Sequence, residues 1–320
     1  MDKLPVRIAV IDDWQSVAGN MADWSTLASV GRVDFLADYP GTAQEMATRL
    51  RPYTIICAMR ERTRFDRALL CQLPQLKLLV TSGMRNAAID LVAAVEAGVE
   101  VCGTGGDANA APELTWALVM ALTRGLLTES DSLRGRGWQC GLGRGLHGQT
   151  LGILGLGKIG QKIAGYAQAF GMRTIAWSEN LTPERAALTG VTYVSKTELF
   201  ERADVLSVHL VLSERSHGLV DAAMLGLMKP SAYLINTARG PIVDEAALIA
   251  TLRARRIAGA ALDVFEQEPL PADHPFRTLN NVLATPHIGY VTEQGYRLFF
   301  SQMIEDILAW QAGEPIRTLS

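Results

Sequence analysis

The sequence has little that would tie the protein to a membrane or to a nucleic acid. It contains no apolar run of about 18 residues, and residues 1–10 lack the long apolar stretch of a signal peptide, so we expect a cytoplasmic protein. The 30 basic and 33 acidic residues leave a formal net charge of -3, and no block of lysine and arginine stands out. We therefore expect neither a membrane nor a nucleic acid as a partner.

Cysteine is scarce as well. The four cysteines, Cys57, Cys71, Cys102 and Cys140, form no Cys-x-x-Cys pair and have no histidine at metal-ligand spacing, so we predict neither a disulfide framework nor a bound metal. The chain does have 320 residues, of which 48% are hydrophobic, and this is enough for two domains with buried cores. The composition favours a globular enzyme.

Short apolar runs alternate with amphipathic stretches along the chain, which is the pattern of strand, helix, strand units in a parallel sheet. Two such series are present. In the first, we predict helices at 43–50 and 89–97 and strands at 7–11, 54–58, 76–81 and 99–102. In the second, we predict helices at 159–170, 221–228 and 244–255 and strands at 151–154, 174–177, 205–209, 232–236, 258–262 and 282–284. Six such strands describe a doubly wound dinucleotide fold.

Three further segments set the predicted domain boundaries. Residues 112–128 are apolar on most faces and are predicted to form one long helix, buried between domains or subunits. The glycine-rich stretch 135–148 is either a flexible surface loop or an extended arm that reaches a partner subunit. Residues 294–312 are again helical, so we expect the chain to return to its first domain. This predicts one domain from 1–102 with 291–320, and another from 103–290.

A glycine motif follows the first strand of the second series. Gly155, Gly157 and Gly160 lie between that strand and a helix, which is the context that a dinucleotide fingerprint requires. The glycines permit a tight turn, close approach of a pyrophosphate and close packing of the helix, whose N-terminus faces the anion. A glycine-rich turn that binds nothing is the alternative, and the flanking strand and helix argue against it.

The residue that should hold the adenosine ribose lies at the end of the next strand. Ser178 occupies the position where a carboxylate is expected, and Glu179 is its neighbour. An inward Glu179 would repel a 2′-phosphate and favour NAD, whereas an outward Glu179 beside Ser178 would permit NADP.

Charged side chains also follow three strands of the second series. Arg239 follows 233–236, Glu268 follows 258–262 and His287 follows 282–284. Because ligands of open α/β sheets bind beyond the carboxyl ends of the strands, we expect these side chains to meet at one edge. A 2-keto acid needs a cation for its carboxylate, a proton donor for its carbonyl oxygen and a hydride for its second carbon, and arginine and histidine suit the first two tasks.

Each of these residues also has a plainer interpretation. Arg239 could form a surface salt bridge, His287 could be a turn residue, and Glu268 could be a solvated loop residue. The hypothesis rests on their convergence, because a carboxylate beside an imidazole favours its charged form and fixes its orientation. Of the other histidines, His209 closes a strand near the predicted cofactor cleft. His147, His217 and His274 lie in loops, and we assign the acid role to none of these four.

Several separated motifs resemble those of the D-isomer-specific 2-hydroxy acid dehydrogenase family. Residues 150–160 (TLGILGLGKIG) resemble its nucleotide fingerprint, and 228–240 (MKPSAYLINTARG) resemble its arginine motif. Residues 262–269 (LDVFEQEP) and 285–289 (TPHIG) resemble its carboxylate and histidine motifs, and 81–86 (TSGMRN) resemble its first-domain loop. The resemblance covers nearly the whole chain. It implies an NAD(P)-dependent oxidoreductase that acts on the CH-OH group of small 2-hydroxy acids, with glyoxylate or hydroxypyruvate as the kind of keto acid expected.

The resemblance also implies a fold and a set of site residues. The fold is α/β with two doubly wound parallel-sheet domains, a Rossmann cofactor domain inserted in a flavodoxin-like substrate domain, and the assembly is a homodimer. The catalytic residues are Arg239, Glu268 and His287. The substrate-binding residues are Gly83, Met84, Arg239 and His287. The residues that bind NAD are Thr104, Gly155, Gly157, Lys158, Ile159, Gly160, Ser178, Glu179, His209, Thr237, Ala238, Asp263, His287 and Gly289, with Asp263 at the nicotinamide amide.

The sequence departs from the family pattern at four positions. Ser178 replaces an aspartate, Tyr290 a glycine and Val211 a proline, and Arg85 changes the first-domain loop. Tyr290 either lies near the substrate or fills core, and Arg85 either recognises an additional anion or forms a structural salt bridge.

Two other functions compete with this one. A nucleotide-sensing protein of the corepressor kind has no chemical need for an arginine, a glutamate and a histidine together. A formate-type dehydrogenase deprotonates no 2-hydroxyl group, and Glu268 beside the histidine argues against it.

Overall fold

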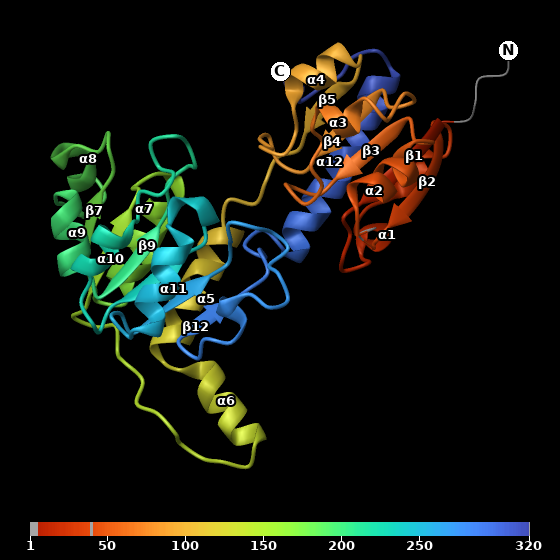
Figure 1. Ribbon diagram of the computed structural model, residues 1–320. Helices are drawn as coiled ribbons and strands as arrows, with labels where there is room; N and C mark the ends of the chain where they lie inside the picture. The colour runs from red at the N-terminus through yellow and green to blue at the C-terminus, as the bar shows by residue number, and fades with distance from the viewer. Residues whose placement is uncertain (1–5, 39–40, 320) are drawn as a thin grey trace, which may run out of the picture. The chain divides into compact units, whose positions relative to one another are not determined.

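The computed structural model describes residues 6–38 and 41–319, and these form two compact units. Unit 1 consists of the chain up to Asp107 together with the chain from Val291 onward, and unit 2 is Ala108–Tyr290. The chain thus leaves unit 1 for unit 2 after residue 107, whereas the sequence placed this domain boundary after residue 102. Each unit is built on one parallel sheet (Figure 1).

Unit 1 has a five-stranded sheet in the order β2-β1-β3-β4-β5, which is the flavodoxin-like order. Its strands are β1 (Val6–Ile11), β2 (Gly31–Leu36), β3 (Ile55–Ala58), β4 (Leu78–Thr81) and β5 (Glu100–Gly103). Its helices are α1 (Ala18–Met21), η1 (Trp24–Leu27), α2 (Ala43–Leu50), α3 (Arg67–Leu70), α4 (Leu91–Glu96) and α12 (Glu293–Gln311). Strand β2 was not predicted, because it is an edge strand with a mixed burial pattern and no continuous apolar run.

Local chemistry explains why these elements form where they do. Strands β3 and β4 are buried at every position, as expected of parallel strands with helices on both faces. Helix α2 begins with a capping box between Thr42 and Glu45 and buries Met46, Ala47 and Leu50. Helix α12 contacts β4, β5 and α1, so the last segment of the chain completes the core of unit 1.

Unit 2 has a seven-stranded sheet in the order β12-β11-β10-β9-β6-β7-β8. Its strands are β6 (Thr150–Leu154), β7 (Arg173–Trp177), β8 (Thr192–Tyr193), β9 (Val205–Val208), β10 (Tyr233–Asn236), β11 (Gly259–Leu262) and β12 (Val282–Ala284). From β8 to β11 this is the 3-2-1-4-5-6 order of a dinucleotide fold, with β12 added at the edge. The two-residue β8 was not predicted because it is too short to show a pattern.

The helices of unit 2 cover both faces of this sheet (Figure 1). They are α5 (Ala110–Thr123), α6 (Leu126–Arg134), α7 (Lys158–Ala169), α8 (Pro183–Ala187), α9 (Lys196–Arg202), α10 (Ala222–Leu227), η2 (Gly240–Ile242), α11 (Glu245–Arg253) and η3 (Pro275–Arg277). The fold class expected from the sequence, two doubly wound parallel sheets, is confirmed.

The prediction of one helix over 112–128 was wrong. The chain forms α5 and then α6, with Gly125 between them in the left-handed conformation at φ 60°. Glycine adopts this conformation without the steric cost that a Cβ imposes, so it ends one helix and starts another. Helix α5 buries Leu118 and Val119 in the core, whereas α6 buries no residue. Helix α5 is thus buried within unit 2, and burial between domains or subunits stays a prediction.

The extended course of 135–148 agrees with the sequence, since these residues form neither helix nor strand. Across the described residues no helix is both long and apolar enough to span a bilayer. Within the same residues no cluster of three or more histidine, cysteine, aspartate or glutamate side chains is suited to a metal ion.

Candidate active site

Three neighbouring strands of unit 2 end level with one another. Asn236 of β10 pairs with Leu262 of β11, and Leu262 pairs with Ala284 of β12. The loops that leave these strand ends carry Arg239, Glu268 and His287, in that order. The structure thus places the three sequence-predicted side chains on adjacent loops at one edge of one sheet.

Glu268 and His287 form a direct pair. The Nδ1 atom of His287 lies 2.5 Å from Oε2 of Glu268, and both side chains are partly shielded from solvent. The backbone of His287 is left-handed at φ 52°, a conformation that a non-glycine residue adopts only at some cost. Because Nδ1 faces Glu268, the opposite ring nitrogen, Nε2, is the one that can face a ligand.

Asp263 fixes the turn that carries His287. Its carboxylate accepts hydrogen bonds from Thr285 Oγ1 at 2.6 Å, from the Ile288 N–H at 2.9 Å and from the Gly289 N–H at 2.8 Å. Burial raises the pKa of Asp263, and these hydrogen bonds together with the neighbouring His287 oppose the rise. Three bonds to one turn hold the unusual backbone of His287 in place.

Arg239 follows β10 in extended backbone and immediately precedes η2. Its carbonyl accepts a hydrogen bond from Asn236 Nδ2 at 2.9 Å, and its Nη1 donates to the Ala238 carbonyl at 2.7 Å. At Gly240 a Cβ would lie 2.0 Å from the carbonyl carbon of Phe265, so only glycine lets the loop that carries Glu268 pack beside Arg239.

Two other predicted residues lie close to these loops. Thr237 shares a hydrogen bond of 2.7 Å with Thr115 of α5. The ring of Tyr290 meets the His287 imidazole edge to face, with centroids 5.6 Å apart and planes at 79°. Tyr290 thus lies beside the acid/base candidate, and its place near the substrate stays a prediction.

The glycine motif forms a cradle that has no room for a side chain at Gly155 or Gly160. A Cβ on Gly155, which has φ 105°, would lie 2.8 Å from the His209 carbonyl oxygen, and a Cβ on Gly160 would lie 2.2 Å from the Gly155 carbonyl oxygen. Gly157 is the N-cap of α7, makes no side-chain capping bond and faces open space, and Lys158 and Ile159 form the exposed first turn. Uncapped N–H groups at a helix N-terminus suit a phosphate, so the residues present fit a dinucleotide.

His209 lies next to this cradle, at the end of β9. Its Nε2 is 2.8 Å from Ser207 Oγ, and desolvation by the surrounding protein lowers the pKa of His209 to about 4. The ring is therefore neutral at neutral pH and is not the proton donor of the site. Ser178 and Glu179 follow β7 in a turn closed by the Leu181 N–H, and Ser178 is half-buried whereas Glu179 is exposed.

The first-domain loop belongs to unit 1. The N–H of Gly83 donates to Thr104 Oγ1 at 2.9 Å, and Thr104 in turn donates to the Gly105 carbonyl at 2.9 Å. Gly83 has φ 89°, and a Cβ there would lie 2.3 Å from Nη1 of Arg60. The Met84 side chain is exposed. Thr104 thus acts within the structure as a support for the loop of Gly83 and Met84.

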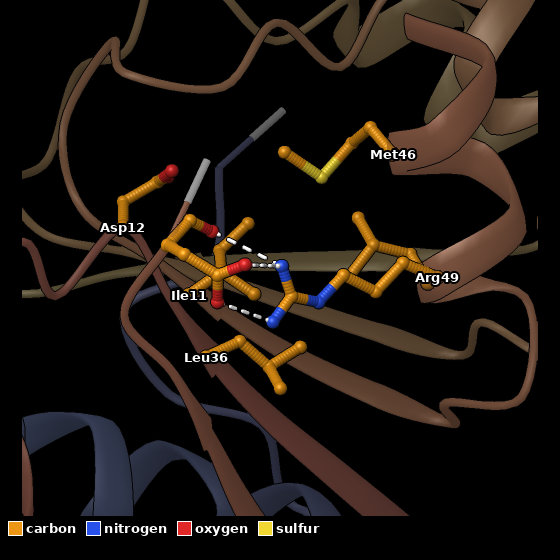
Figure 2. A pocket seen from close by; sticks show the side chains of 7 residues that line it. Ile11, Asp12, Leu36, Met46 and Arg49 are labelled. Carbon is orange, nitrogen blue, oxygen red and sulfur yellow. Dashed lines mark hydrogen bonds and ion pairs between the residues drawn. The ribbon is translucent and has the colours of Figure 1, made fainter. Parts of the chain in front are cut away.

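A small hollow in unit 1 has no part in this chemistry. Figure 2 shows its lining, in which the Arg49 guanidinium forms a two-pronged pair with Asp38, at 2.8 and 2.6 Å, beside Ile11, Leu36 and Met46. Its volume is about 10 Å³, which is room for roughly one water molecule. It is too small for a keto acid.

Sequence reasoning missed a second histidine–carboxylate pair near the site. His274 Nε2 lies 3.0 Å from Glu245 Oε1, and both side chains are largely buried. The sequence places His274 in a polar loop and Glu245 at the start of a helix, and no motif links positions so far apart along the chain. The proline after His274 and the proline-rich loop around it were the available signals of a fixed turn.

Comparison with known proteins finds similar sequences and structures among oxidoreductases of 2-hydroxy acids. The family model described as "D-isomer specific 2-hydroxyacid dehydrogenase, NAD binding domain" matches residues 116–289, more than half of the chain. A glyoxylate reductase of Aeropyrum pernix is 37% identical over 261 residues, which are 78% of this chain and 78% of that protein. An (S)-sulfolactate dehydrogenase of Chromohalobacter salexigens is 39% identical over 240 residues, 74% of this chain and 78% of that protein. The crystal structure of a phosphoglycerate oxidoreductase from Vibrio cholerae superposes with a TM-score of 0.91 at 34% identity, over 97% of this chain and 100% of that one.

Proposed function

Because the chain belongs to the D-isomer-specific 2-hydroxyacid dehydrogenase family, we propose that it interconverts a small 2-keto acid and the D-2-hydroxy acid with NAD as cofactor. The observation that carries this proposal is the Glu268–His287 contact of 2.5 Å, which joins the loops after β11 and β12 beside the loop of Arg239 at the carboxyl edge of the unit 2 sheet. Similar proteins reduce glyoxylate or act on sulfolactate by name, which supports small, anionic substrates.

His287 is the acid/base in this proposal. In the direction of reduction, its Nε2 donates a proton to the carbonyl oxygen, and in the direction of oxidation it takes that proton back. Glu268 holds Nδ1 and so orients the ring. Asp263 helps to hold His287 in this position, because its carboxylate accepts backbone N–H groups of the turn 285–289.

Arg239 binds the carboxylate and polarises the carbonyl group. A guanidinium offers two parallel N–H donors that match two carboxylate oxygens. In the loop of unit 1, we propose the Met84 N–H as the substrate-binding donor, since the Gly83 N–H already donates to Thr104. Gly83 then serves by allowing the loop its left-handed turn.

The dinucleotide is held by the glycine cradle and the N-terminus of α7. Gly155, Gly157, Lys158, Ile159 and Gly160 receive the pyrophosphate, and Ser178 and Glu179, which follow the next strand, lie at the adenosine ribose. His209, Thr237, Ala238, Asp263 and Gly289, with Thr104 of unit 1, line the remainder. The bound nicotinamide supplies the hydride, and the protein supplies position and charge.

The decisive experiment follows absorbance at the reduced-nicotinamide band with a panel of small 2-keto acids, glyoxylate and hydroxypyruvate among them, with NADH and NADPH in parallel. We expect turnover with at least one keto acid, faster with NADH. Binding of NADH without turnover on any keto acid would point to a nucleotide sensor. Oxidation of formate would point to the formate-type reaction.

The His287→Ala variant tests the assigned acid/base. Loss of general acid/base catalysis should lower kcat by about 100-fold or more, while the Kd for NADH stays within about twofold of wild type. The matched control is His217→Ala, which removes a loop histidine of the same unit. Near-normal turnover of His287→Ala would remove this residue from the mechanism.

A further inference from the structure

Glu268 lies in a long loop between β11 and β12 whose only regular element is η3. Such a loop cannot hold a catalytic pair at hydrogen-bond distance unless its backbone is tied down. One tie is internal, since the Phe265 N–H donates to Glu268 Oε1 at 2.9 Å. The position of Glu268 therefore depends on what fixes the backbone near Phe265 and at the far end of the loop.

Glu245, the first residue of α11, fixes the loop at both of these points. Its Oε2 accepts the Glu266 N–H at 3.2 Å, and its Oε1 lies 3.0 Å from His274 Nε2. The two attachment points lie on either side of Glu268 in the sequence. With side-chain exposures of 13% for His274 and 17% for Glu245, this pair is better shielded than the catalytic pair, at 21% for His287 and 33% for Glu268.

His274 also contacts the hydrophobic core of unit 2, through Phe276. Its Nδ1 accepts the Phe276 N–H at 3.3 Å and so caps η3, which leaves Nε2 to carry the proton donated to Glu245. Its ring lies 4.9 Å from that of Phe276, a residue buried in the main core cluster of unit 2. Both ends of the loop are thus tied to rigid parts of unit 2.

We propose that Glu245 and His274 are positioning residues for the reaction: they hold the loop so that Glu268 reaches His287, and they touch neither substrate nor cofactor. The inference rests on the proposed function and adds a second histidine–carboxylate pair to it. A displacement of about 1 Å in a catalytic group can cost on the order of 100-fold in rate, so a partial loosening of the loop should cost about 10-fold.

Two substitutions of His274 separate its two contacts. In His274→Asn the side-chain oxygen replaces Nδ1 and keeps the η3 cap, but the donor to Glu245 is lost. In His274→Gln the side-chain amide replaces Nε2 and keeps the donor to Glu245. We expect His274→Asn to lower kcat about 10-fold with the KM for NADH unchanged, and His274→Gln to retain most of the wild-type kcat. The matched control, Lys229→Met, breaks the similarly half-buried Lys229–Asp204 pair elsewhere in unit 2 and should leave kcat near wild type.

A double-mutant cycle shows whether the pair acts through Glu268. If it does, adding His274→Asn to Glu268→Gln should lower kcat by less than about twofold, because the link that it supports is already broken. An equal 10-fold loss in both backgrounds, or wild-type turnover of His274→Asn, would overturn the proposal.

A proton NMR measurement on the resting protein gives a readout that needs no turnover. The low-field signal of the His287 Nδ1 proton, identified by its loss in His287→Ala, should persist in His274→Gln and broaden or vanish in His274→Asn. Wild-type protein without activity on any keto acid would refute the proposed function, while this signal would still decide the positioning role. An unchanged His287 Nδ1 signal in His274→Asn would contradict the positioning role of His274.

Discussion

At the scale of single residues, the site is organised by carboxylates that bind the backbone of another segment. Asp263 holds the turn of His287, and Glu245 holds the loop of Glu268. A carboxylate that accepts backbone N–H groups gains charge-assisted hydrogen bonds and fixes a segment that has no secondary structure of its own. The positions of the proposed catalytic residues Glu268 and His287 therefore depend on these two carboxylates.

The Arg239→Lys variant tests the carboxylate clamp. Lysine keeps the charge but loses the planar pair of donors, so kcat/KM for the keto acid should fall at least about 10-fold, while the Kd for NADH stays near wild type. Steady-state kinetics with NADH titration measures both. The control Arg253→Lys changes an exposed arginine of α11 and should have no effect. An unchanged response to keto acid would refute the clamp.

The sequence identified some of these residues and not others. Arg239, Glu268 and His287 stand just after strands, and the topology of a parallel sheet brings strand ends together. Glu245 and His274 stand apart from that pattern. Their meeting depends on how one loop folds back onto the start of α11, which no spacing in the sequence encodes.

At the scale of elements, α12 contains a carboxylate that is fully buried in unit 1. Asp306 accepts a hydrogen bond from Arg317 Nε at 2.9 Å, and Arg317 also pairs with Glu305. Desolvation raises the pKa of Asp306 to about 7, against the attraction of Arg317, and Glu305 adds to the rise. The buried thiols of Cys57 and Cys102 also lie close enough for the Asp306 charge to raise their pKa values, after the larger effect of burial.

This buried acid predicts a pH-dependent stability. Since the folded pKa of Asp306 lies above the ordinary value of 3.8, the folded state holds a proton that the unfolded chain releases. The protonated carboxyl contributes its full stabilisation below pH 3.8. As the pH rises from there towards 7, the free energy of unfolding falls by at most about 4 kcal/mol. The Asp306→Asn variant cannot ionise, so its free energy of unfolding should depend less on pH.

Urea unfolding of both proteins at pH 5 and pH 8 measures this difference. Asp12, whose pKa burial raises to about 6, contributes in the same direction in both proteins and therefore cancels. Glu305→Gln, which alters an exposed partner of the same arginine, serves as the control. Equal pH dependence of Asp306→Asn and the wild type would contradict the prediction.

Element boundaries also show what a sequence leaves undecided. The break between α5 and α6 falls at Gly125, between the apolar α5 and the pair Leu126 and Leu127. Glycine is tolerated within helices at a cost of about 1 kcal/mol, so its presence does not require a break. Only packing, which buries α5 against the sheet and leaves α6 without a buried residue, decides that the helix ends there.

At the scale of the whole molecule, α6 and the stretch after it expose several apolar side chains, and we predict that a second copy of the chain covers them. Leu126, Leu127, Leu133, Trp138 and Leu142 are all exposed, and α6 projects from the rest of unit 2 (Figure 1). Contiguous exposed apolar side chains mark interaction surfaces, and the family resemblance favours a second copy of the same chain as the occupant.

Light scattering coupled to size-exclusion chromatography tests this assembly. We expect twice the mass of 34.7 kDa for the wild type, and a monomer for the double variant Leu127→Glu with Leu133→Glu, because two charges would be buried unpaired at the interface. The control Leu188→Glu, which changes a still more exposed leucine of unit 2 outside this surface, should remain dimeric. A monomeric wild type would refute the assembly.

The sequence by itself determined the two parallel sheets, the glycine cradle and the three charged residues after β10, β11 and β12. These follow from hydrophobic periodicity and from residues at strand ends, both of which are local along the chain. Tertiary structure alone decided the break after α5, the left-handed turn held by Asp263 and the anchoring of the Glu268 loop by Glu245 and His274. Each of these depends on contacts between segments far apart in the chain, whose energies outweigh local preference only once the core has formed.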